Sequence, residues 1–121
     1  MAIGKVNKYG IRVGDVFKST HGYSMVINDF YKVIEILGDY KIRVRALEKI
    51  NVDDDGYGQQ GEEIMDYDNF DMREKPLDKM VKLHHRYDNT ETYYIKISDY
   101  EYAYLLPKED YNKPCWFDYM D

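Results

Sequence analysis

The clearest pattern in the chain is a strict alternation of apolar and basic residues over 40–46. One set is Tyr40, Ile42, Val44 and Ala46, and the other is Lys41, Arg43 and Arg45. A period of two places the two sets on opposite faces of a half-buried strand. The segment 29–37, rich in Phe, Tyr, Val and Ile, predicts a second strand. Gly38-Asp39 between them predicts the turn of a hairpin.

Other short apolar segments predict strands along the rest of the chain. They cover residues 11–19, 79–87, 93–97, 101–106 and 114–119. Composition predicts an acidic loop over 51–61, and the pattern over 62–78 fits neither a strand nor a helix cleanly. Six or seven short strands without a long helical period predict a mostly β fold. We expect a small antiparallel β-barrel or sandwich, of the size of SH3 or OB domains, with little helix.

The composition is that of one folded domain. At 121 residues the chain has the length of a single domain, which we expect to span 1–121 with 1–10 as a loose lead-in. Aromatic residues make up 16% of it, whereas disordered chains are poor in aromatics. Cys115 is the single cysteine, no signal peptide is recognisable, and no apolar run approaches the ~20 residues that span a bilayer. We therefore expect a cytoplasmic protein with no membrane partner.

The charges are unevenly distributed along the chain, whose formal net charge is −6. Residues 51–72 hold eight acidic residues and no Lys or Arg, and residues 99–121 hold six acidic and two basic residues. Such asymmetry produces a strong local field even where the total charge is modest. Either these segments are solvated acidic surface, or they face a basic partner.

Tyrosine is the second compositional signal, with fourteen copies. Tyrosine gives large, stiff, amphipathic contact area and is enriched at interface hot spots. Interleaved carboxylates suit a partner with a basic surface, such as a protein that grips nucleic-acid phosphates. The predicted partner-binding residues are Asp99, Tyr100, Glu101, Tyr102, Asp110 and Tyr111, with a second acidic patch at Asp53, Asp54 and Asp55. The alternative is that about half of the tyrosines belong to the core.

A second candidate surface is basic. Lys41, Arg43 and Arg45 share one strand face, and a basic sheet face beside aromatic residues is typical of proteins that bind single-stranded nucleic acid. Four residues that could extend this face are Lys79, Lys82, His84 and Arg86. The alternative is an ordinary solvated strand face.

The residue types do not predict catalysis or a transition-metal site. Cys115 could pair with His21, His84 or His85, but the spacing does not support a nucleophile and base, and a buried, inert thiol is favoured. One cysteine and three histidines fall short of a zinc site, and His84 and His85 point to opposite faces of a strand. We expect no enzyme activity, no cofactor and no metal site.

The acidic loop leaves calcium binding open. Residues 51–62 place oxygen-bearing side chains at loop positions 1, 3, 5, 9 and 12 and glycine at position 6, as an EF-hand loop does. Position 1 is Asn51 instead of Asp, position 8 is Gly58 instead of an apolar residue, and the flanking segments do not predict helices. A solvated acidic loop is the favoured interpretation.

Three short motifs follow one another in the N-terminal half of the sequence: Gly14-Asp15-Val16-Phe17-Lys18-Ser19, Gly22-Tyr23 and Asp29-Phe30-Tyr31-Lys32-Val33. This pattern resembles an uncharacterised family of small proteins encoded by phages and mobile elements. That family runs Gly-Asp-Ile/Val-Phe, a Ser, aromatic-Gly-Tyr, a polar stretch and Phe-Tyr-x-Val. The segment 97–117 is similar to the family's closing strands, whereas His21 and residues 24–27 depart from its pattern. The resemblance implies a viral or mobile-element origin and no known chemistry.

Together these features predict a phage-type accessory protein that works by binding. We expect it to inhibit a host nucleic-acid-handling defence protein, in the manner of an anti-CRISPR or anti-restriction protein, in the cytoplasm of a bacterial host. The alternative is a small nucleic-acid-binding β-barrel that uses Lys41, Arg43 and Arg45. An enzyme of nucleotide metabolism or signalling is a third, weaker hypothesis.

Overall fold

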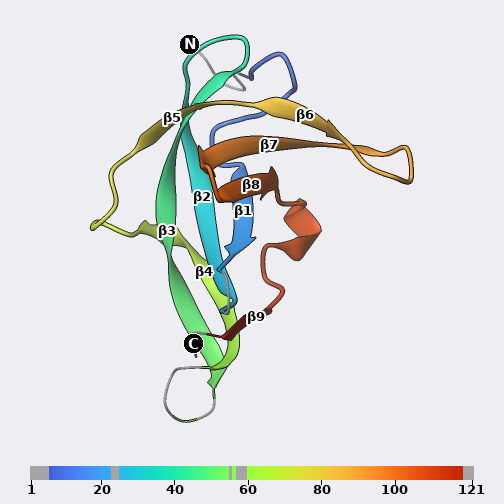
Figure 1. Ribbon diagram of the computed structural model, residues 1–121. Coiled ribbons are helices and arrows are strands. Elements are labelled where there is room, and N and C mark those ends of the chain that lie inside the picture. Colours follow the sequence, from blue (N-terminus) through green and yellow to red (C-terminus); the bar gives the residue numbers. More distant parts are fainter. Residues whose placement is uncertain (1–5, 23–24, 55, 57–59, 119–121) are drawn as a thin grey trace.

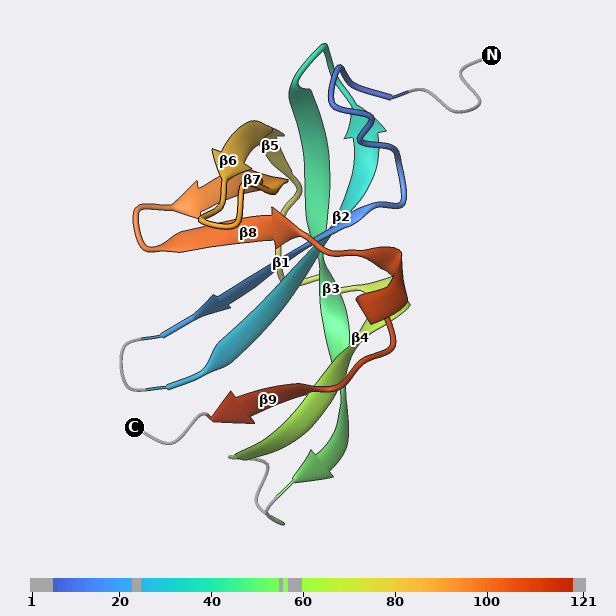
Figure 2. The same cartoon turned by 90° about the vertical axis from the view of Figure 1, so that its right-hand side faces the viewer.

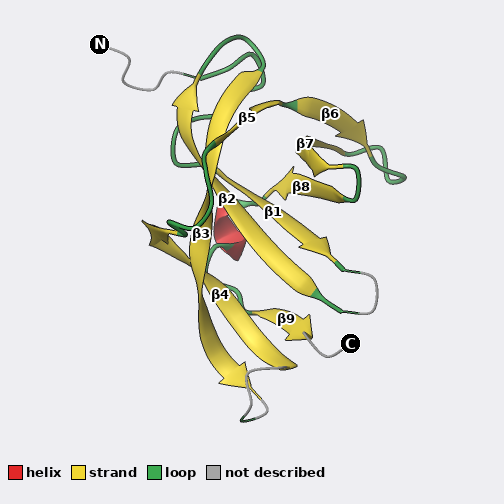
Figure 3. Cartoon of the chain, turned by 60° about the vertical axis from the view of Figure 1, so that its left-hand side comes forward, coloured by secondary structure: helices red, strands yellow, loops and turns green. Residues whose placement is uncertain are grey.

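A computed structural model describes residues 6–22, 25–54, 56 and 60–118. This part of the chain forms nine strands and one 3₁₀ turn (Figure 1). The elements are β1 (Val16–His21), β2 (Ile27–Ile36), β3 (Lys41–Asp54), β4 (Gln60–Phe70), β5 (Leu77–Met80), β6 (Lys82–His85), β7 (Glu91–Ser98), β8 (Glu101–Leu105), η1 (Lys108–Asp110) and β9 (Cys115–Asp118). Strand dominates throughout (Figure 3), and among the described residues no helix is long and apolar enough to cross a membrane.

The strands form one strongly curled antiparallel sheet in the order β6-β7-β8-β1-β2-β3-β4-β9. The segment 77–85 connects distant parts of this sheet, because β5 pairs with β3 while β6 pairs with β7 (Figure 1). The chain between them bends at Val81, which is buried and donates its backbone N–H to Tyr40 O. This closure confirms the predicted antiparallel, barrel-like β fold.

Two apolar clusters hold the sheet together. The larger one fills the curl of β1, β2, β3, β7 and β8, and its fully buried members include Phe17, Val33, Ile42, Val44 and Ile95. The smaller one lies where β3, β4 and β9 extend away from that curl (Figure 2), and it contains Val16, Phe30, Leu47 and Met65. In β3 the apolar set of the 40–46 alternation faces inward from Ile42 onward, as the period-two pattern predicts.

The acidic loop is shorter than composition predicts. Residues 51–54 continue β3, and β4 begins at Gln60, with Asp53 paired to Glu62 and Asp54 to Gly61. Among the described residues of the predicted 51–61 loop, only Gly56 therefore lies outside a strand. Cross-strand pairing can override the poor strand propensity of Asn and Asp, because strand preference depends on neighbours more than on the residue itself.

The predicted lead-in contains packed residues in its described part. The buried Asn7 side chain accepts hydrogen bonds from the backbone N–H groups of Tyr9 and Ile11. The Tyr9 ring stacks on Tyr93 at 4.7 Å between centroids and contacts Tyr40 at 5.1 Å. Residues 7–11 thus cover one end of the larger cluster.

Candidate functional site

The outer face of the sheet carries a cluster of aromatic rings, here called the tyrosine platform: His84, Tyr94, Tyr102 and Tyr104. Tyr94 in β7 is paired with Tyr104 in β8, and their ring centroids lie 5.7 Å apart. Tyr102 contacts Tyr94 at 5.9 Å, and His84 contacts Tyr104 at 5.8 Å. Tyr102 and Tyr104 are about 40% exposed, at 41% and 39%. The platform is therefore a group of partly exposed rings that meet in edge-on and tilted contacts.

Lysines surround the platform. Directly paired residues of neighbouring antiparallel strands project from the same face. Three such pairs join a lysine to a platform ring: Lys18–Tyr104, Lys82–Tyr94 and Lys96–Tyr102. Lys96 also lies 3.2 Å from Asp99 at the turn after β7. The charge next to the rings is thus mainly positive, although the whole chain is acidic.

The same face continues past β1 and β2 into a cavity of about 490 Å³ beside β9. Its lining includes Lys18, Phe30, Lys113 and Trp116, and the Lys18 ammonium lies 5.9 Å from the centre of the Phe30 ring. Trp116 is 54% exposed. Aromatic and basic groups therefore extend from β6 across the sheet to β9.

The six residues predicted as an acidic, tyrosine-rich patch do not share one surface. Asp99 and Tyr100 are exposed at the turn between β7 and β8, and Tyr102 belongs to the platform. Glu101 points to the inner side, where its side chain is only 13% exposed. Carboxylates and tyrosines are separated here because alternate residues of β8 point to opposite faces.

The other two members of that patch lie near η1. The ring of Tyr111 packs on Tyr67 at 5.6 Å beside the smaller apolar cluster, and burial raises its pKa to about 12. Asp110 forms an ion pair with Lys113 at 2.6 Å. Tyr111 is thus part of the packing and not a free contact residue.

The second predicted acidic patch, Asp53 to Asp55, falls at the end of the β3–β4 hairpin. Asp53 and Asp54 are the last residues of β3, and Asp55 lies outside the described residues. The calcium hypothesis concerns the same hairpin. Its flanks are two paired strands, whereas an EF-hand loop joins two helices. The hairpin is therefore not an EF-hand.

On the alternative basic face of β3, one of the three cations is already paired with carboxylates. The Arg43 guanidinium donates two hydrogen bonds to Asp78, at 2.7 and 3.1 Å, and one to Glu35 at 2.8 Å. Arg45 is half-buried with its guanidinium 5.8 Å from the centre of the Phe70 ring. Lys41 is exposed. The three residues share a face, as predicted, but Arg43 already has two carboxylate partners.

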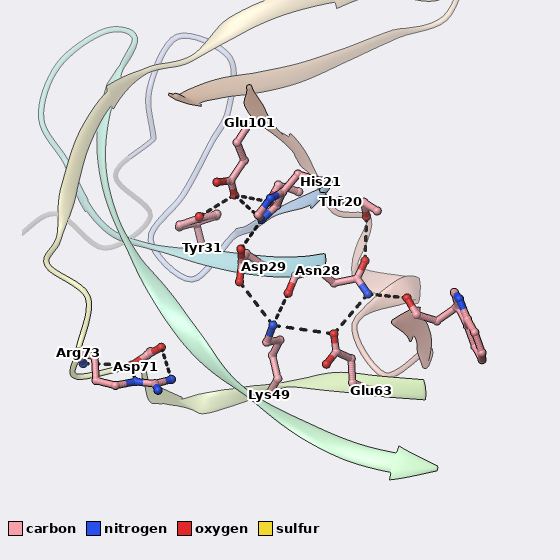
Figure 4. Close-up of polar contacts among 12 residues, drawn as sticks. Thr20, His21, Asn28, Asp29, Tyr31, Lys49, Glu63, Asp71, Arg73 and Glu101 are labelled. Carbon is pink, nitrogen blue, oxygen red and sulfur yellow. Dashed lines mark hydrogen bonds and ion pairs between the residues drawn. The ribbon is translucent and has the colours of Figure 1, made fainter. Parts of the chain in front are cut away.

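On the inner side, a group of polar residues forms where β1, β2 and β8 meet, here called the polar cluster: Ser19, His21, Asp29, Tyr31 and Glu101. Figure 4 labels the last four of them. His21 Nε2 lies 2.7 Å from Asp29 Oδ2 and 3.6 Å from Glu101 Oε2. The hydroxyls of Ser19 and Tyr31 both donate to Glu101 Oε2, at 2.5 and 2.8 Å. Burial and the bond to Glu101 raise the pKa of Tyr31, so this hydroxyl stays a donor.

Lys49 links the polar cluster to a more deeply buried pair. Its ammonium lies 3.5 Å from Asp29 Oδ1 and 3.9 Å from Glu63 Oε2, and it donates to Asn28 O at 2.6 Å (Figure 4). The Asn28 amide in turn donates to Glu63 Oε2 at 3.3 Å and to Trp116 O at 2.7 Å. The polar cluster and this extension thus join residues of six strands, β1, β2, β3, β4, β8 and β9, through charged and hydrogen-bonding groups.

Two cavities border the polar cluster. One of about 620 Å³ is lined by Asp29, Tyr31, Lys49 and Glu101. The other, of about 540 Å³, is lined by His21, Tyr100 and Glu101. The ionisable groups of the cluster are therefore accessible to small solutes.

No pattern in the sequence predicts that His21, Asp29 and Glu101 lie together. Ser19 and Glu101 are 82 residues apart in the chain, and only strand pairing unites them. Ser19 and Tyr31, which belong to two of the motifs noted in the N-terminal half, both contact Glu101. Cys115, predicted to be a buried thiol, is half-buried at the start of β9.

No family model matches the chain, and no curated protein or solved structure matches it. The resemblance to phage and mobile-element proteins therefore stays a prediction. What the protein does must be inferred from the platform and the polar cluster.

Proposed function

We propose that the chain is a binding protein that holds single-stranded nucleic acid on the tyrosine platform. The observation that supports this most directly is the pairing of platform rings with lysines across neighbouring strands: Lys18–Tyr104, Lys82–Tyr94 and Lys96–Tyr102. Proteins that bind single strands combine aromatic rings, on which bases stack, with cations that follow the phosphates. The candidate nucleic-acid face is thus β6–β7–β8–β1, in place of the strand face of Lys41, Arg43 and Arg45.

The energetics favour single strands over duplexes. Stacking of a base on an aromatic ring contributes about 1–3 kcal/mol and requires an unpaired base. Tyr102 and Tyr104 are exposed enough to offer such contacts. Each lysine that neutralises a phosphate releases counterions, so binding should weaken as salt rises. The overall acidity of the chain is compatible with this, because the platform's immediate neighbours are basic.

The direct test is fluorescence anisotropy at 50 mM salt with labelled single-stranded DNA, single-stranded RNA and duplex DNA. We expect a single strand to bind and the duplex to bind more weakly. Tyr94→Ala and Tyr104→Ala should each weaken binding by about 5- to 150-fold, the equivalent of one stacked base. The matched control is Tyr100→Ala, because Tyr100 is 92% exposed but lies off the platform. Absence of binding to all three probes would overturn the proposal.

A phage-type inhibitor of a host nucleic-acid-handling protein is the second candidate. It is supported by the turn between β7 and β8, where Tyr100 is 92% exposed and the Asp99 side chain 82%. An exposed aromatic ring beside a carboxylate suits a basic protein surface. Of the partner-binding residues predicted from the sequence, Asp99 and Tyr100 would contact the host protein in this role, and Glu101 would not.

One capture experiment with two variants distinguishes the two candidate functions. Immobilised protein would be incubated with lysate of a bacterial host at 0.1 and 1 M salt, with Asp99→Asn/Tyr100→Ala as one variant and Tyr94→Ala/Tyr104→Ala as the other. The inhibitor hypothesis predicts a captured nucleic-acid-handling protein that is lost at high salt and lost with the turn variant alone. Capture that is lost with the Tyr94→Ala/Tyr104→Ala variant and also lost after nuclease treatment would favour nucleic-acid binding.

A further inference from the structure

The polar cluster presents three potential metal ligands from three different strands. His21 in β1, Asp29 in β2 and Glu101 in β8 each offer one atom, and these atoms all lie within 4.8 Å of one another. Ligands bound at about 2.0–2.2 Å to one ion are separated by about 3–3.5 Å. The spacings of His21 Nε2 to Asp29 Oδ2 and to Glu101 Oε2, 2.7 and 3.6 Å, bracket that range. Small side-chain adjustments would complete a coordination site.

Neighbouring groups fix the orientation of one ligand. Tyr31 donates to Glu101 Oε2 (Figure 4), as Ser19 does, and the two hydroxyls so hold this carboxylate toward His21. Hydrogen bonds of this kind, from residues around the ligands, orient metal sites and increase their affinity. Glu101 is also the least exposed ligand, at 13% for its side chain, compared with 24% for His21 and 32% for Asp29.

The charges in this region favour a bound cation. The two candidate carboxylate ligands, Asp29 and Glu101, both lie within 3.6 Å of the same imidazole, that of His21. The Lys49 ammonium lies 3.5 Å from Asp29. Partly buried carboxylates repel one another unless a proton or a cation compensates them. A divalent ion between His21, Asp29 and Glu101 would provide that compensation.

We propose that His21, Asp29 and Glu101 bind a divalent transition-metal ion through three protein ligands. An imidazole with two carboxylates suits zinc or manganese, whereas calcium and magnesium prefer sites made entirely of oxygen. The two cavities that touch these residues leave room for water or a small anionic ligand at the remaining coordination positions. This site lies on the inner side of the sheet and is independent of nucleic-acid binding on the outer face.

The test is isothermal titration of the full chain, first freed of metal with a chelator, with zinc chloride and separately with manganese, calcium and magnesium chloride. We expect one zinc ion per chain. His21→Ala, Asp29→Asn and Glu101→Gln should each weaken zinc binding by about 100-fold or more, since even groups around the ligands alter affinity by about 10- to 100-fold. Calcium and magnesium should bind far more weakly.

The matched control is His85→Ala. His85 Nδ1 also lies 3.6 Å from a carboxylate, that of Glu91, but on an exposed edge and with no third ligand among the described residues. The His85→Ala substitution should leave the zinc affinity within about twofold of that of the unmodified protein. Equal losses in His85→Ala and His21→Ala would show binding by exposed histidines and overturn the proposal.

Folding of each variant is checked by circular dichroism. Independently of any variant, zinc added to the unmodified protein should shift the imidazole NMR signals of His21 and leave those of His84 and His85 in place. Cobalt substituted for zinc should give visible absorption bands of a site with nitrogen and oxygen ligands. Unchanged His21 signals at saturating zinc would end the proposal even if every variant failed to fold.

Discussion

The Tyr31 hydroxyl reaches Glu101 Oε2 at 2.8 Å, joining β2 to β8 across the inner side of the sheet. This contact stabilises a weakly paired part of the fold, because β8 pairs with β1 through only two residue pairs, Phe17–Leu105 and Lys18–Tyr104. Toward His21 the two strands diverge, and one of the cavities opens there. Side-chain hydrogen bonds therefore replace backbone pairing where β1 and β8 separate.

Tyr31→Phe should destabilise the fold by about 1–3 kcal/mol. The ring is buried and keeps its packing, but a charged, mostly buried carboxylate loses one of its two hydroxyl donors. Urea denaturation measures the free energy of unfolding. The control is Tyr102→Phe, an exposed tyrosine of the platform, which should change stability by no more than about 0.5 kcal/mol. Equal effects of the two substitutions would contradict a structural role of the Tyr31–Glu101 bond.

Ile95→Ala should be more damaging than a chemically identical change at Ile50. Ile95 is fully buried in the larger apolar cluster, where truncation leaves a cavity and removes about 2–5 kcal/mol. Ile50 is 44% exposed on the β3–β4 hairpin, so its truncation should cost less than about 1 kcal/mol. Thermal and urea unfolding of both variants give the comparison. Similar losses would mean that the hairpin contributes as much to the core as the curled sheet does.

The alternation of residues 40–46 shows how far a local pattern predicts this fold. It places Ile42 and Val44 in the core and Arg43 outside, as found, because one buried face is enough to fix the orientation of a strand. The extension of β3 to Asp54 was not predictable in this way. Its acidic residues have low strand propensity and adopt the strand through their partners in β4.

The candidate sites show what a local sequence pattern does not predict. In β8, Glu101 and Ala103 face inward and Tyr102 and Tyr104 outward, although apolarity alone would place the tyrosines inside. Tyrosine has an apolar ring and a polar hydroxyl and suits either face, so the alternation did not reveal which side is buried. The His21–Glu101 contact depends in addition on the relative positions of two strands far apart in sequence, which a linear pattern does not contain.

Gly22→Ala should destabilise the fold next to the end of β1. Gly22 has φ of 119°, and an added Cβ would lie 2.6 Å from Met25 O. A side chain at such a position costs more than about 1 kcal/mol. Gly38→Ala is the control, since a Cβ there meets nothing within 4 Å. The unfolding midpoint of Gly22→Ala should be lower than that of Gly38→Ala. An unchanged midpoint for Gly22→Ala would show that the backbone at Gly22 adapts to a side chain without cost.

Asp78→Asn should change how the fold responds to acid. The hydrogen bond from Arg43 holds the pKa of Asp78 below its ordinary value. A carboxyl whose pKa is lower in the folded state stabilises the fold above its unfolded pKa, and this stabilisation is lost as the pH falls. The variant should therefore be less stable than the unmodified protein at neutral pH, and the difference should shrink as the pH falls below the ordinary pKa of a carboxyl group. Urea midpoints between pH 7 and pH 2.5 measure this, and a difference that is independent of pH would assign the effect to packing.

Removing the platform's lysines should reduce the salt dependence of nucleic-acid binding. Lys18, Lys82 and Lys96 are the cross-strand neighbours of Tyr104, Tyr94 and Tyr102. Each phosphate contact to a single strand contributes about −0.7 to the slope of log affinity against log salt, so the triple change to glutamine should make the slope shallower by about 2. The control is Lys41→Gln/Arg43→Gln, which alters the β3 face and should leave the slope unchanged. If the slope became shallower in the control variant and stayed unchanged in the triple variant, the nucleic acid would lie on β3.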